Sequence, residues 1–165
     1  DLLGRGVARA RELRDEPSVQ ARMLEVMAQA YDNLGRYDEA EALEGRVVEL
    51  LGADPGGGDP GEVAEAIVRW GLALSKSGRY DSARVVLSRA REVQERVLPP
   101  GSTDLSYTLE AQARVDIYLG DLDAAERRAR AALELRETSL GPAATETISS
   151  PNPATSHEPA APVAA

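Results

Sequence analysis

The sequence of 165 residues has no cysteine and no phenylalanine, and it has a single tryptophan and a single histidine. The absence of cysteine excludes disulfides, thiol nucleophiles and thiolate metal sites. The one histidine, His157, lies in a stretch of Ala, Pro, Ser and Thr near the C-terminal end. A catalytic triad or a histidine metal site needs a histidine within a folded part of the chain, so both are excluded.

Motifs for phosphate and nucleotide chemistry are also missing. The run Gly56-Gly57-Gly58 is followed by Asp59-Pro60 and not by Gly-Lys-Ser/Thr, which is typical of a flexible linker. The glycine-rich, catalytic-loop and metal-binding motifs of a protein kinase are absent. The 28 carboxylates leave a paired-acid site open, but most of them begin helices or stand beside Arg at helical spacing. We therefore expect a chain that is not an enzyme and that holds no cofactor and no metal.

Positive charge is scarce as well. The chain has 19 basic and 28 acidic residues and a net charge of −9, which argues against sequence-independent nucleic-acid binding and disfavours an anionic membrane surface. No stretch reaches the roughly 18 apolar residues of a membrane span, and residues 1–7 lack the apolar core of a signal peptide. The first residue is Asp1 and not Met, so we expect a piece of a longer protein.

Three similar blocks are the strongest positive signal. They read Gly35-Arg36-Tyr37-Asp38-Glu39-Ala40, Gly78-Arg79-Tyr80-Asp81-Ser82-Ala83 and Gly120-Asp121-Leu122-Asp123-Ala124-Ala125. Their glycines lie 43 and then 42 residues apart. Self-similarity at such a period is typical of a solenoid, in which each unit buries its apolar surface on its neighbours.

Each block separates two runs in which apolar residues recur at helical spacing. Val19, Met23 and Met27 belong to the run before Gly35, for example, and Leu43 and Val47 to the run after it. Because aromatic residues make up only 4% of the chain, the core between such helices must be filled by Leu, Val and Ala. The fold class predicted is all-α, a right-handed α-solenoid of antiparallel helix hairpins. Its parts are the second helix of a truncated preceding repeat (1–14), repeat 1 (17–51), repeat 2 (60–98), repeat 3 (102–140) and a disordered C-terminal tail (143–165).

The residues at the helix ends agree with this division. Glycine tolerates the left-handed conformation of a helix C-cap, so the three block glycines are expected to end the first helix of each hairpin. Asp38 with Glu41, and Asp123 with Glu126, place an acid at a helix start and a Glu three residues on. An Arg-rich helix at residues 1–14 could alternatively lie on a membrane, but the acids that close it argue against this.

The hairpins resemble the tetratricopeptide repeat. That family has a small residue seven positions before the glycine, a Tyr-like residue four before it and an Ala five after it. The matching residues are Ala28, Tyr31 and Ala40, then Gly71, Leu74 and Ala83, then Ala113, Asp116 and Ala125, where Asp116 departs from the pattern. The usual repeat is about 34 residues long, so the longer period resembles the kinesin-light-chain variety. The asparagine of that variety is replaced by Val26, Arg69 and Ala111.

A second resemblance covers residues 2–51. Leu2-Leu3-Gly4-Arg5-Gly6 and Tyr31-Asp32-Asn33-Leu34-Gly35 look like the opening of the C-terminal repeat region of bacterial serine/threonine protein kinases. The resemblance implies a kinase domain and often a membrane span upstream. The near absence of lysine, with only Lys76, is a further bacterial hint. The alternative is a free-standing repeat scaffold or assembly factor, which would be cytoplasmic.

In hairpins of this kind the first helices line the concave face, where we expect a protein or peptide partner to bind. The two-carboxylate clamp of chaperone-binding repeats is rejected, because Glu25 and Leu72 occupy places that need cations or amides. Exposed apolar residues at the last repeat (Leu133, Leu135 and Leu140) leave self-association open. The predicted partner-binding residues are Arg22, Glu25, Gln29, Asn33, Glu65, Val68, Leu72, Lys76, Tyr107, Glu110, Arg114 and Tyr118.

Overall fold

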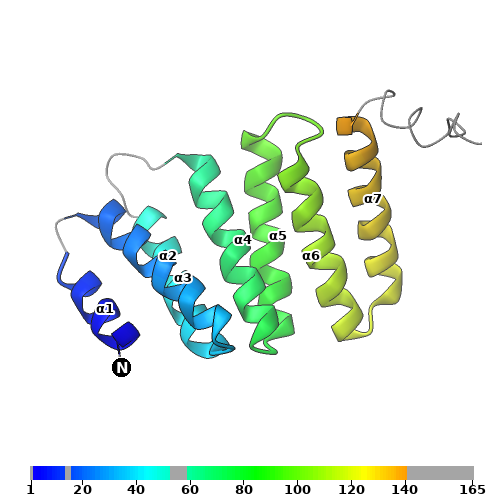
Figure 1. Ribbon diagram of the computed structural model, residues 1–165. Helices are drawn as coiled ribbons and strands as arrows, with labels where there is room; N and C mark the ends of the chain where they lie inside the picture. The colour runs from blue at the N-terminus through cyan, green and yellow to red at the C-terminus, as the bar shows by residue number, and fades with distance from the viewer. Residues whose placement is uncertain (1, 14–15, 53–58, 141–165) are drawn as a thin grey trace, which may run out of the picture.

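The computed structural model describes residues 2–13, 16–52 and 59–140. These residues form seven α-helices that lie side by side in one row (Figure 1), with no strand among them. The model therefore confirms the predicted all-α solenoid of antiparallel helix hairpins. The predicted tail and the glycine run at 56–58 lie outside the described residues. The helices are α1 (Leu2–Arg11), α2 (Pro17–Asn33), α3 (Tyr37–Gly52), α4 (Pro60–Lys76), α5 (Tyr80–Val97), α6 (Thr103–Leu119) and α7 (Leu122–Leu140).

The three block glycines end the first helix of each hairpin, as predicted. Gly35, Gly78 and Gly120 have φ angles of 71°, 80° and 79°, in the left-handed region that glycine adopts without strain. In each turn the glycine N–H donates to the carbonyl three residues back, and the next N–H donates to the carbonyl five back. This pair of bonds is the Schellman motif, which satisfies carbonyls that a helix end leaves free.

The helix starts agree with the acidic residues that the sequence places there. Asp59 caps α4 by accepting a hydrogen bond from the Gly61 N–H at 3.2 Å, and Pro60 takes the first helical position. In α7 the cap is Asp121, which accepts from the Ala124 N–H at 3.1 Å. Asp123 lies in the first turn of the same helix, as predicted.

The core is aliphatic and continuous along the row. Within the hairpins α2 packs on α3, α4 on α5, and α6 on α7, while α3 also contacts α4 and α5 contacts α6. Leu24, Val47, Ile67, Leu87 and Val115 are all at most 1% exposed, and alanines fill the spaces between them. This packing follows from the shortage of rings, because small side chains let helix axes approach closely.

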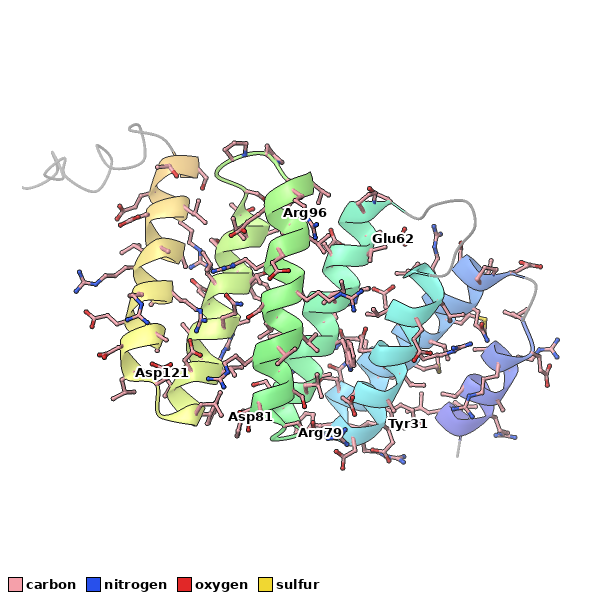
Figure 2. All side chains as sticks on the ribbon, turned by 180° about the vertical axis from the view of Figure 1, so that it is seen from behind. Tyr31, Glu62, Arg79, Asp81, Arg96 and Asp121 are labelled. Atoms are coloured by element: carbon pink, nitrogen blue, oxygen red, sulfur yellow. The ribbon has the colours of Figure 1, made fainter. Side chains whose placement is uncertain are left out.

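The row has two sides and two ends. The first helices α2, α4 and α6 form one side, here called the first-helix face, and α3, α5 and α7 form the second-helix face. Figure 2 shows Arg79, Asp81 and Asp121 together at the end where the hairpin turns lie, and Glu62 and Arg96 at the opposite end. The turns of successive hairpins therefore lie at the same end of the molecule, and so do the side chains near them.

Candidate functional site

Two neighbouring clefts open on the first-helix face. The first, of about 210 Å³, brings together residues of α2, α3, α4 and α6, among them Gln29, Asp32 and Tyr107. The second, of about 290 Å³, lies nearer the hairpin turns and is lined by residues such as Tyr80 and Arg114. Leu72 and Lys76 of α4 line both clefts, so the two form one continuous surface around this helix.

Half of the predicted partner-binding residues meet in these clefts. Leu72 forms part of their shared wall and is half-buried against the core, whereas the other five are exposed. Arg22, Asn33 and Glu65 are exposed on the same helices but do not line either cleft. The six predicted residues that line the clefts are Gln29, Leu72, Lys76, Tyr107, Arg114 and Tyr118.

Val68 differs from the expectation. Its side chain is 6% exposed and belongs to the hydrophobic core, so it cannot contact a partner on the first-helix face. The prediction assumed that α4 buries a single stripe. In the structure α4 packs against α3, α5 and α6, so a wider part of its circumference is covered.

Tyrosine rings gather at the clefts. Four of the five tyrosines line them: Tyr37 and Tyr80, at the starts of α3 and α5, and Tyr107 and Tyr118 of α6. Tyr80 and Tyr118 stack with ring centroids 4.5 Å apart and an interplanar angle of 8°. Tyr37 and Tyr80 are not among the predicted partner-binding residues, because those were taken from first helices only. Both nevertheless hold the same place in the repeated blocks.

Glu25 and Glu110 are half-buried and held by ion pairs, so they are less available to a partner than predicted. The Glu110 carboxylate lies 2.5 Å from the Arg136 guanidinium of α7. Glu25 contacts Arg69, whose guanidinium also lies 3.5 Å from the Glu44 carboxylate. Burial raises the pKa of Glu44 to about 7, and the nearby charge of Glu25 acts in the same direction, although Arg69 opposes both.

The cations of the clefts differ in how they are held. Lys76 donates to both Asp32 oxygens at 2.8 and 2.6 Å and so joins α4 to α2. Arg114 is exposed and forms no ion pair with any described residue. Its guanidinium therefore has free donors beside the stacked tyrosines, an arrangement suited to a carbonyl, a carboxylate or a second ring.

The described residues contain neither a membrane-spanning helix nor a cluster of metal ligands. None of these helices combines the length and the apolar character that crossing a membrane requires. No group of three or more His, Cys, Asp or Glu side chains in the described part of the chain is placed to hold a metal ion.

The chain is similar to known repeat proteins. Two models of the tetratricopeptide repeat match it, one over residues 62–138 and the other over residues 21–53. No curated protein matches the sequence. The crystal structure of BtubC (BKLC) from P. vanneervenii matches 88% of the chain with a TM-score of 0.64. The identity to it is 21%, which shows the fold alone, and the chain spans 55% of its length.

Repeats of this family typically form non-catalytic scaffolds that bind proteins or peptides. The matched residues cover helices of all three hairpins and agree with the glycine turns, the small residues and the row of helices described above. The chain is therefore a tetratricopeptide-repeat protein.

Proposed function

We propose that the first-helix face binds an extended or helical peptide segment of a protein partner in the two clefts around α4. The observation that carries this proposal is the meeting of Tyr107, Tyr118, Arg114 and Leu72, from two different repeats, on one surface. Tyr and Arg are the side chains most often responsible for binding energy in interfaces. The half-buried Leu72 lines both clefts and offers a partner an apolar surface near the tyrosine rings and the free guanidinium.

The test uses peptides selected from a random displayed library against the whole chain. Binding of a selected peptide is measured by fluorescence anisotropy for the wild type and for Tyr107→Ala and Arg114→Glu. We expect each substitution to weaken binding by tenfold or more, because a central anchor contributes at least about 2 kcal/mol. Arg89→Glu is the matched control, since Arg89 is exposed on α5 and lines a groove with Trp70 that shares no residue with the clefts.

The result separates the first-helix face from other surfaces. Unchanged affinity in both cleft variants would overturn the proposal, and so would an equal loss in Arg89→Glu. Circular dichroism of each variant checks that the helices persist.

We further propose that the chain is the accessory region of a bacterial serine/threonine kinase and brings partners to a kinase domain in the same polypeptide. This rests on the resemblance of residues 2–51 to such regions. The alternative is a free-standing scaffold. Reading the gene upstream of Asp1 decides between them: catalytic kinase motifs there favour the first proposal, and a nearby start codon favours the second.

We also propose the repeat boundaries given by the sequence, with α1 as the second helix of a preceding repeat. In support, α1 packs on α2 as α3 packs on α4 and α5 on α6. Self-association through the last repeat is a separate possibility that rests on Leu133, which is 57% exposed. Light scattering over a range of concentrations tests it, with Leu133→Glu expected to abolish any dimer.

A further inference from the structure

A second groove lies on the opposite side of the molecule, between α5 and α7 on the second-helix face. Its volume is about 270 Å³. The alanines of α7 keep it open because they have no long side chain to fill it, and Leu109 of α6 contributes an apolar wall. The remaining lining is cationic. The lining residues are Arg91, Leu109, Ala124, Arg127, Arg128 and Ala131.

The guanidinium groups at this groove lie close enough to repel one another. Burial, and after it the charges of Arg91 and Arg84, lower the pKa of the Arg128 guanidinium. Arg84 and Arg91 stand two turns apart on the same stripe of α5. Three arginines, Arg91, Arg127 and Arg128, thus line one groove of a chain whose net charge is −9, and Arg84 adds its charge nearby.

Carboxylates pair with three of these arginines, and two of the three pairs are exposed. Asp116 pairs with Arg128 from a buried position in α6. Glu95 lies 3.4 Å from the Nε of Arg91 and Asp81 lies 3.6 Å from the Arg84 guanidinium, and both carboxylates are exposed. Such exposed pairs are weak and readily exchanged.

Some hydrogen-bond donors of these arginines have no acceptor within the described part of the chain. Arg127 is exposed and forms no ion pair within the described part of the chain. The Nε of Arg91 is buried and lies 3.4 Å from the Glu95 carboxylate, but it forms no hydrogen bond with it. Because a guanidinium carries five N–H donors and a buried donor without an acceptor is costly, an incoming oxyanion would gain contacts that the protein itself leaves unmade.

We propose that the groove between α5 and α7 binds a phosphate monoester on a partner peptide, that is, a phosphoserine or phosphothreonine side chain. A phosphate carries close to two negative charges and three acceptor oxygens, enough to engage Arg91 and Arg127 from the two walls at once. A carboxylate carries a single charge and engages one guanidinium fork. The site is separate from the clefts of the first-helix face and does not depend on peptide binding there.

The experiment titrates the ¹⁵N-labelled chain with a short phosphoserine peptide and follows the arginine Nε–H signals by NMR. Matched peptides with glutamate or serine at the same position, and inorganic phosphate alone, are titrated at equal ionic strength. We expect the signals of Arg91, Arg127 and Arg128 to shift saturably with the phosphopeptide and with inorganic phosphate. Arg127→Gln should weaken phosphopeptide binding by about tenfold, the value of one charged hydrogen bond.

Arg89→Gln is the matched control, because Arg89 is an exposed arginine of α5 that lines the other groove, beside α3. It should bind the phosphopeptide as the wild type does. Absence of saturable shifts, equal binding of the glutamate peptide, or an Arg127→Gln variant that binds like the wild type would each overturn the proposal. Tyr107→Ala should leave these shifts unchanged, which separates this test from that of the first-helix clefts.

Discussion

Asp116 and Arg128 form an ion pair at the junction of α6 and α7 in which the carboxylate is fully buried. Asp116 occupies the place where the other two repeats have Tyr31 and Leu74, so a charge has replaced an apolar side chain in the core of the third repeat. Breaking a buried pair leaves one charge uncompensated, which costs more than removing both partners.

From this we predict that Asp116→Ala lowers the free energy of unfolding by about 3 kcal/mol. The double variant Asp116→Leu/Arg128→Leu should lose distinctly less, because neither charge then remains buried. Urea denaturation of the wild type, both single leucine variants and the double variant gives the coupling energy. If the effects of the two single substitutions simply added up, the ion pair would contribute no coupling energy and the prediction would be wrong.

Glu44 gives a pH-dependent prediction. Its pKa is about 7 in the folded chain against an ordinary 4.5, because burial between α3 and α4 disfavours its charge, with Glu25 and Asp32 adding repulsion and Arg69 opposing them. The folded state therefore holds this proton more tightly than the unfolded state. The associated stability is present below about pH 4.5 and is lost as the pH rises through about 7.

Glu44→Gln should remove this dependence, since the amide does not titrate. We expect the variant to gain stability relative to the wild type between pH 5 and pH 8, by up to about 3 kcal/mol. Thermal unfolding across that range measures the difference. Glu49→Gln on the same helix is the control, because Glu49 is exposed. Parallel profiles for Glu44→Gln and the wild type would contradict a titrating Glu44.

At the scale of the helix, the sequence predicted the features that depend on one residue or its immediate neighbours. Gly35, Gly78 and Gly120 mark the hairpin turns because a positive φ is a property of one residue. The position of Val68 could not be predicted in the same way, since its burial depends on how many helices pack around α4. The pairing of Asp116 with Arg128 and the stacking of Tyr80 on Tyr118 likewise join different helices, and no single periodic stripe contains both partners.

Gly71 allows α4 to approach α5, which gives a prediction for this element. A Cβ at this position would lie 2.6 Å from the Leu87 side chain, and Leu87 is fully buried. Gly71→Ala should therefore lower the free energy of unfolding by about 1–2 kcal/mol, despite the better helix propensity of alanine. Leu87→Val in the same chain should restore part of the loss, which calorimetry can measure.

Gly52→Ala provides the contrast for that experiment. Gly52 ends α3, has no atom of the described residues within 4 Å of an added Cβ and does not have a positive φ. The same substitution there should be neutral or stabilising by a few tenths of a kcal/mol. If both glycine variants were destabilised equally, the helix approach at Gly71 would not be the cause.

For the molecule as a whole, burial is concentrated in the middle of the row. Helices α3 and α4 bury several large aliphatic side chains each, whereas the buried hydrophobic residues of α7 in the described chain are Ala124, Ala125 and Ala132. In a solenoid each helix contacts its neighbours only, so stability is close to a sum of local contributions. A terminal helix that buries little can therefore open while the centre stays folded.

Native-state hydrogen exchange should show this gradient directly. We expect the amides of α3, α4 and α5 to exchange slowest and those of α1 and α7 at least about tenfold faster, through partial opening. Leu87→Ala should speed exchange in α4 and α5, because it removes about 2–5 kcal/mol of central packing, while changing α7 less. Leu133→Ala, at an exposed position of α7, should leave every helix unchanged. A single exchange free energy shared by all seven helices would instead mean that the row unfolds as one cooperative unit, with the polar contacts between α5 and α6 coupling the last repeat to the rest.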